Sequence, residues 1–89
     1  MTLKELMLKK VQFTRQGIKY TRNKIAESTA EMNENERAFF VSVDGEYVGS
    51  VWLWDDQTIT FFDKIREEDI PVKTTAHVKR CVDNVLKEG

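Results

Sequence analysis

The sequence contains only one cysteine, one proline and one histidine. A single cysteine excludes an internal disulfide framework, which favours an intracellular, cytoplasmic protein. No apolar run approaches the ~18 residues that a membrane-spanning helix needs. The segment 1–10 lacks the continuous apolar core of a secretion signal. We therefore expect one soluble domain over residues 1–89 that makes no membrane contact.

The sequence also lacks the residue clusters that metal centres and active sites need. His77 and Cys81 stand four residues apart, but two ligands do not make a zinc site and the chain has no second pair. The acidic residues between 55 and 69 do not follow the spacing of a calcium loop. The four glycines are scattered and form no phosphate-binding loop. We expect no cofactor, no metal and no catalytic residue, and hence a protein that is not an enzyme.

Aromatic residues are concentrated in the stretch 38–63, AFFVSVDGEYVGSVWLWDDQTITFFD, which holds both tryptophans and four of the five phenylalanines. Asp44-Gly45 is a favoured two-residue hairpin loop, because both residues tolerate a positive φ. A second turn at Asp55-Asp56 returns the chain, which predicts an antiparallel meander of three strands. If this second turn is longer than two residues, the last strand shifts and can change faces.

Alternation along these strands divides their side chains between two faces. The face expected to form the core carries Phe39, Val41, Val43, Val48, Trp52, Trp54, Ile59 and Phe61. The opposite face carries Phe40, Tyr47, Val51, Leu53 and Phe62, diluted by serine, threonine and glycine. This second face is too apolar for an ordinary solvent-exposed face. Either the terminal helices or closure of a barrel cover it, or it is an interaction site.

Two helices are predicted to flank the meander. Thr2 and Glu5 match a capping box, which starts a short helix that ends near residue 10. Thr74 or Thr75 caps a longer helix that runs to about residue 87. This helix has an apolar stripe of Val78, Cys81, Val82, Val85 and Leu86. The stretches 27–37 and 64–73 are expected to be loops, the first of them a mobile connection with room for a helical turn.

Residues 11–25 fit two structures. Both 11–15 and 18–22 alternate in polarity as strands do, and Gln16-Gly17 can form the loop of a hairpin that places Phe13 opposite Tyr20. Alternatively, apolar residues at 11, 18, 25 and 32 recur every seven positions and continue the first helix. That helix would contain Gly17 and many β-branched residues, which is costly. We favour the hairpin, and with it an α+β fold whose antiparallel meander grows from three strands to five and curls towards a partly open barrel.

The two-faced meander predicts a small non-enzymatic binding or regulatory protein that acts through protein–protein contacts and self-associates. Its predicted partner-binding residues are Phe40, Tyr47, Leu53, Trp54 and Phe62. The alternative is a nucleic-acid-binding module that uses the basic segment 9–24, because rings flanked by cations can stack bases and neutralise phosphates. Its candidate residues are Phe13, Arg15, Lys19, Tyr20, Arg22 and Lys24. In the competing interpretation these rings belong to the core and the cationic side chains extend around them. A small-ligand binder or an enzyme is the third hypothesis, for which no convergent polar cluster exists.

Overall fold

The structure, a computed structural model that describes residues 1–88, is a six-stranded antiparallel sheet with three helices. Each strand pairs with the next one along the chain, so the sheet is a simple meander. The strands are β1 (Gln12–Arg15), β2 (Ile18–Arg22), β3 (Arg37–Val43), β4 (Glu46–Leu53), β5 (Ile59–Asp63) and β6 (Glu68–Val72). The helices are α1 (Leu3–Lys9), α2 (Lys24–Thr29) and α3 (Thr75–Glu88). The predicted α+β class is confirmed, with six strands in place of three to five.

The N-terminal hairpin has the predicted register. Phe13 pairs with Tyr20 and Thr14 pairs with Lys19. Gln16 and Gly17 both have positive φ, 55° and 77°, as a two-residue hairpin loop requires. The continuous helix is therefore wrong, because glycine and β-branched residues favour the strand structure at these positions.

Both terminal helices begin at the predicted caps. Thr2 Oγ1 accepts a hydrogen bond from the Glu5 backbone N–H, and the Glu5 carboxylate accepts one from the Thr2 N–H. Thr74 Oγ1 accepts a hydrogen bond from the His77 N–H at the start of α3. These short-range bonds explain why sequence patterns alone were sufficient to find both helices.

The stretch predicted as a mobile connection begins inside α2, which one carboxylate holds in place. Glu27 accepts hydrogen bonds from Arg22 Nε at 2.9 Å, from Arg22 Nη2 at 2.9 Å and from the Ala38 backbone N–H at 3.1 Å. Burial raises the pKa of Glu27, but these hydrogen bonds outweigh it and leave the pKa below its ordinary value. Glu27 therefore stays ionised at neutral pH and joins α2 to β2 and β3.

The stretch predicted as the second loop, 64–73, contains β6. Its strand is polar and holds Pro71, which cannot donate a hydrogen bond to a sheet ladder. β6 lies at the edge of the sheet and pairs only with β5, which is where a sheet tolerates proline. The other edge is β1, so in the described part of the chain the sheet stays open and no barrel closes.

A β-bulge reverses the faces predicted for most of β4. Ser42 pairs with Tyr47 as expected, but Val41 pairs with Gly49 and not with Val48. The bulge adds one residue to β4, and side chains alternate along a strand, so every later residue points to the other face. The ring of Phe61 lies against Gly49, where a Cβ atom would be only 2.7 Å from its Cζ atom.

The predicted core face is consequently wrong for residues 51–54, whereas Ile59 and Phe61 are buried in the core as predicted. Val51 and Leu53 are buried in the core, whereas Trp52 and Trp54 lie on the opposite side of the sheet. The turn after β4 spans five residues, 54–58, and places Leu53 opposite Ile59. The longer turn therefore shifts β5 by one position relative to β4, as expected for a turn of more than two residues. Together with the bulge, this shift keeps Phe61 in the core.

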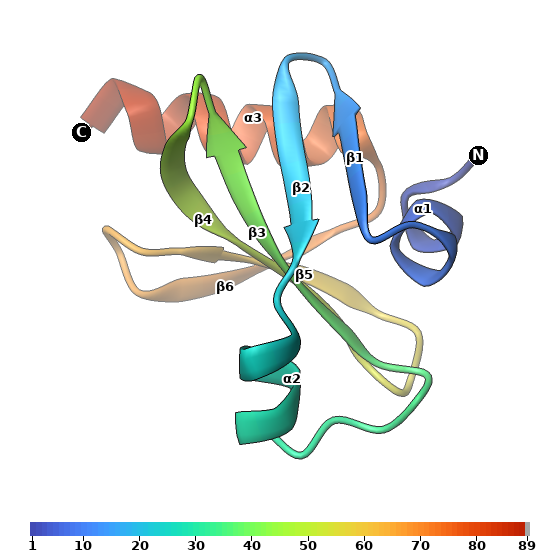
Figure 1. Cartoon of the computed structure of the whole chain (residues 1–89). Helices are drawn as coiled ribbons and strands as arrows, with labels where there is room; N and C mark the ends of the chain where they lie inside the picture. The colour runs from blue at the N-terminus through green and yellow to red at the C-terminus, as the bar shows by residue number, and fades with distance from the viewer. Residues whose placement is uncertain (89) are drawn as a thin grey trace.

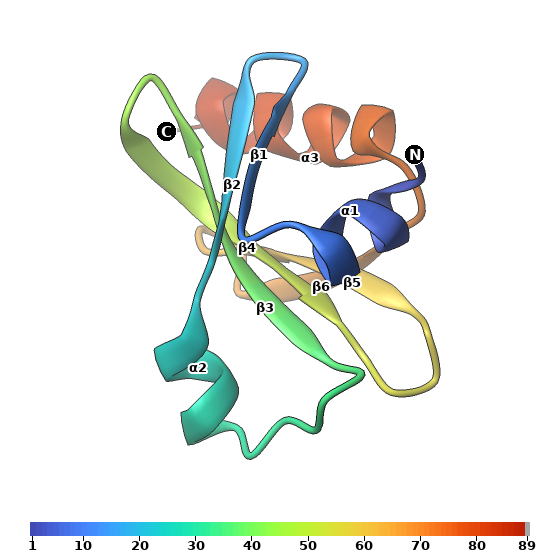
Figure 2. The same cartoon turned by 45° about the vertical axis from the view of Figure 1, so that its right-hand side comes forward.

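The core lies between one face of the sheet and the two terminal helices. Figures 1 and 2 show α1 and α3 together beside the strongly twisted sheet, while α2 stands apart beyond the end of β2. The core includes Leu6 and Met7 of α1 and Val78, Val82 and Val85 of α3. No helix in residues 1–88 is long and apolar enough to cross a membrane.

Candidate functional site

The sheet face opposite α1 and α3 carries five aromatic side chains, which we call the aromatic face: Phe40, Tyr47, Trp52, Trp54 and Phe62. Phe40 and Phe62 lie in one row because both pair with Ser50, and Trp52 lies in the next row opposite Thr60. Phe40 is 43% exposed and Tyr47 is 41% exposed, and the other three side chains are half-buried. The described helices thus leave Phe40 and Tyr47 exposed and the other three rings partly accessible to solvent.

The rings of the aromatic face form two ordered clusters. Phe40 and Tyr47 meet edge to face, with ring centroids 5.9 Å apart and an interplanar angle of 85°. Trp52 and Trp54 are stacked at 5.7 Å and 11°. Such contacts contribute about 0.5–1.5 kcal/mol each beyond simple burial. The rings are therefore held in position before any partner arrives.

The polar atoms of Tyr47 and Trp54 already have partners within the chain. The Tyr47 hydroxyl lies 3.0 Å from the hydroxyl of Ser50. The indole Nε1 of Trp54 donates a hydrogen bond to Thr60 Oγ1 at 2.9 Å. What the two rings offer to a partner is consequently apolar ring surface.

Charges of opposite sign lie at the two ends of the aromatic face. At one end, Lys64 Nζ lies 5.0 Å from the centroid of the Tyr47 ring and donates to the Tyr47 carbonyl oxygen. Lys19 belongs to the same end, since it pairs with Ser42, the partner of Tyr47. At the other end, Asp55 and Asp56 follow Trp54.

The acidic end carries its charge at neutral pH. Hydrogen bonds from the side chain and the backbone N–H of Thr58 lower the pKa of Asp56. A carboxylate with a lowered pKa stays ionised over the physiological range. The face therefore has a cationic end and an anionic end, with the aromatic rings between them and Asp69 beside Phe62 at the β6 edge.

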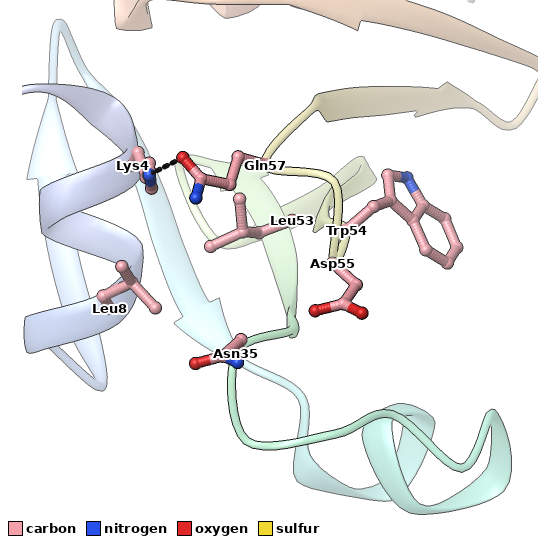
Figure 3. A pocket seen from close by; sticks show the side chains of 7 residues that line it. All are labelled: Lys4, Leu8, Asn35, Leu53, Trp54, Asp55 and Gln57. Atoms are coloured by element: carbon pink, nitrogen blue, oxygen red, sulfur yellow. Dashed lines mark hydrogen bonds between the residues drawn. The ribbon is translucent and has the colours of Figure 1, made fainter.

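Four of the five predicted partner-binding residues share the aromatic face, and Leu53 does not. Leu53 is 1% exposed and lies in the core, because the bulge in β4 reversed its direction. Figure 3 shows Leu53 pointing towards α1, into a small pocket of about 230 Å³, whereas the indole of Trp54 points away from it. Trp52 takes its place on the face. Its spacing of two residues from Trp54 was the available signal.

The basic segment 9–24 does not expose the rings predicted to stack bases. Phe13 and Tyr20 are both buried and stack on each other, with centroids 4.4 Å apart at 13°. Arg22 is bound in an ion pair to Glu27 at 2.9 Å. Arg15, Lys19 and Lys24 are exposed. A nucleic acid at this segment would meet cations without an aromatic surface, and its binding stays a prediction.

Tyr20 carries a buried hydroxyl for which residues 1–88 provide no hydrogen-bond partner. The side chain is 0% exposed, and burial raises the pKa of its phenol far above the ordinary value. Because an unsatisfied buried polar group costs about 1–3 kcal/mol, we expect Tyr20→Phe to stabilise the protein by about 1 kcal/mol. Urea denaturation followed by circular dichroism measures this change. A less stable Tyr20→Phe variant would show that the hydroxyl has a partner in solution.

His77 and Cys81 do not form a site together. Cys81 is buried in the core, and burial raises the pKa of its thiol, while His77 lines an open pocket at the start of α3. Within residues 1–88, no group of three or more histidine, cysteine, aspartate or glutamate side chains is placed to hold a metal ion.

The aromatic face is thus the feature of the fold whose arrangement most directly indicates a role. Compared with known proteins, the chain matches no family model, no curated protein and no solved structure. The function proposed for it must therefore follow from its own residues.

Proposed function

We propose that this chain is a small non-enzymatic binding or regulatory protein whose aromatic face associates with the same face of a second copy. The observation that carries the proposal is the set of five aromatic side chains on a sheet face that α1 and α3 leave uncovered. Large exposed apolar patches on soluble domains mark interaction sites. Tyrosine, tryptophan and phenylalanine are the residues enriched at such interfaces.

The charge distribution favours a second copy over an unrelated protein. A two-fold symmetric dimer needs one patch that is complementary to itself. With a two-fold axis that lies in the interface, perpendicular to the line that joins the two charged ends, Lys19 and Lys64 of one protomer would lie over Asp55 and Asp56 of its partner. Opposite charges so placed fix the relative orientation of the protomers. They disfavour the arrangement in which ends of the same charge meet, because like charges repel.

Internal hydrogen bonds and ring contacts lower the free-energy cost of association at the aromatic face. Trp54 Nε1 and the Tyr47 hydroxyl keep their internal hydrogen bonds when the face is covered, so neither of these two groups becomes unsatisfied. The stacked and edge-to-face contacts restrict the rotamers beforehand, which lowers the entropy lost on binding. Burial of the ring faces then contributes roughly 25 cal/mol for each Å² of apolar surface removed from water.

We expect the double substitution Phe40→Ser and Tyr47→Ser to raise the dissociation constant of the dimer at least tenfold. Both side chains are among the most exposed aromatic groups of the face, so the change removes contact area with little loss of core packing. A tenfold change corresponds to about 1.4 kcal/mol. Sedimentation equilibrium over a wide range of concentrations measures the constants of the original and the changed protein.

Leu86→Ser is the matched control for this experiment. Leu86 is 43% exposed, as Phe40 is, but it lies on α3, on the opposite side of the sheet. We expect Leu86→Ser to leave the dissociation constant within about twofold. Equal weakening by both changes would mean that general surface hydrophobicity, and not the aromatic face, drives association.

Tryptophan fluorescence gives a second readout at the proposed interface. Both tryptophans of the chain, Trp52 and Trp54, lie on the aromatic face and are half-buried. Their emission should therefore shift to shorter wavelength as the protein is concentrated and the face is covered. A protein that stays monomeric at about 1 mM, with an unchanged emission maximum, would contradict the proposal.

A further inference from the structure

A second site lies away from the aromatic face, where α1, the β5–β6 edge and the first turn of α3 meet. An open pocket of about 670 Å³ occupies this junction. Pockets of 300–1,000 Å³ hold small organic ligands. The pocket is therefore large enough for a metabolite and much larger than a single inorganic ion needs.

All ionisable side chains that line this pocket are basic: Lys4, Lys73, His77 and Arg80. The chain as a whole has 15 acidic and 14 basic residues, so an all-basic lining is not what the average composition supplies. Among the described residues, Lys73 and Arg80 form no ion pair. The positive charge of the pocket is consequently not neutralised from within.

Lys4 is held at the pocket by a neutral partner. Its ammonium group donates a hydrogen bond to the side-chain oxygen of Gln57, which Figure 3 shows from the neighbouring smaller pocket. Gln57 also lines the larger pocket. An amide partner orients the ammonium group but leaves its charge available to an anion.

The start of α3 adds to the basic character of the pocket. His77 and Arg80 are three residues apart on this helix, so both side chains lie on one side of it. The first turn of α3 contains no acidic residue. The positive end of the helix dipole acts on the same space as these two side chains. Two basic groups of α3, His77 and Arg80, and Lys73 in the segment before it thus line one pocket.

Part of the pocket lining is apolar. Ile59 and Val72, which pair across β5 and β6, line it together with Pro71. An apolar wall beside a basic end suits a molecule that has a carbon body and one strongly charged group. Phosphate matches the basic end better than carboxylate does, because its double charge and several acceptor oxygens can engage several cations at once.

We propose that this pocket binds a small organic phosphate, with its phosphate at Lys73, His77 and Arg80 and its body against Ile59, Pro71 and Val72. The proposal does not depend on self-association through the aromatic face, since the two sites use different residues. Lys4 would close over the ligand from α1 and contribute a further positive charge.

Nitrogen-15 NMR titration at low salt with adenosine monophosphate, inorganic phosphate and adenosine tests this proposal. We expect saturable shifts of the amides at 73–78 with adenosine monophosphate, weaker binding of inorganic phosphate, and no saturation with adenosine. The nucleotide serves as a probe with a phosphate and a flat body. Failure of both phosphates to saturate these shifts, or binding of adenosine as tight as that of the nucleotide, would overturn it.

Substitutions distinguish binding at this pocket from a general attraction of anions to the positively charged surface. Lys73→Ala with Arg80→Ala should weaken binding of adenosine monophosphate at least tenfold. Lys10→Ala with Arg15→Ala removes the same charge at exposed positions elsewhere and should change binding less than twofold. All four side chains are exposed, so both proteins are expected to keep their melting temperature. Equal weakening by the two pairs would refute a site at this pocket.

Discussion

Replacing Val82 with aspartate is expected to unfold the protein at room temperature. Val82 is 1% exposed and lies in the core between Val78 and Val85 on α3. An unpaired carboxylate buried there loses its hydration and costs several kcal/mol, in addition to the lost apolar packing. Domains of this size are stable by only about 5–10 kcal/mol. Circular dichroism and thermal denaturation should show loss of the folded baseline and of the cooperative transition.

Asn84→Asp provides the matched control on the same helix. Asn84 is exposed, so this change adds the same carboxylate to α3 on its solvent side. We expect its free energy of unfolding to stay within about 0.5 kcal/mol of the original protein. If Val82→Asp folds cooperatively while the control is unaffected, α3 does not stabilise the sheet, and the core described above is wrong.

Gly49→Ala is expected to destabilise the protein by about 3 kcal/mol, the upper part of the usual range for overpacking a filled core. A Cβ atom at this position would lie 2.7 and 2.9 Å from two carbons of the Phe61 ring, and 2.9 Å from the backbone oxygen of Phe62. Real side chains do not approach so closely, so the ring or β5 itself must move. Chemical denaturation gives the change in the free energy of unfolding.

A double-mutant cycle shows whether the ring causes this cost. In a Phe61→Leu background the ring contacts are absent, so Gly49→Ala should cost at least 1 kcal/mol less there than in the original protein. Gly17→Ala is the comparison, because its cost of about 1–2 kcal/mol comes from a positive φ and no atom lies within 4 Å of its Cβ position. The cost of Gly17→Ala should be the same in the original protein and in the Phe61→Leu background. An equal cost of Gly49→Ala in both backgrounds would contradict the packing of Phe61 on this strand.

The candidate site was only partly accessible from the sequence, and β4 shows why. Asp44 and Gly45 set the first pairs of the hairpin correctly, but pairing was predicted to continue without interruption past Val48. In the bulged pairing the ring of Phe61 lies against Gly49, and Phe61 belongs to the next strand along the chain. Local patterns do not contain that contact. Trp52 was accordingly assigned to the core and Leu53 to the surface.

The basic pocket was not foreseen at all, for a related reason. Lys4, Gln57, Lys73 and Arg80 are far apart in the sequence and come together only because α1 and α3 pack beside the β5–β6 edge. Each of them taken alone is an ordinary surface residue. Only the pocket that they share sets them apart from the other charged residues of the chain.

The sequence by itself determined what depends on residues within a few positions of each other: the N-caps of α1 and α3, the two-residue hairpin loops with positive φ, the apolar stripe of α3 and the α+β class. The tertiary structure alone decided the faces of Trp52 and Leu53, the anchoring of α2 by Glu27 to Ala38, and the pairing of β6 with β5. The physical reason is that side chains alternate between the two faces of a sheet, so one inserted residue reverses the direction of every later side chain in its strand. One extra residue in β4 therefore exchanged the inside and the outside of the part of the strand that carries the tryptophans.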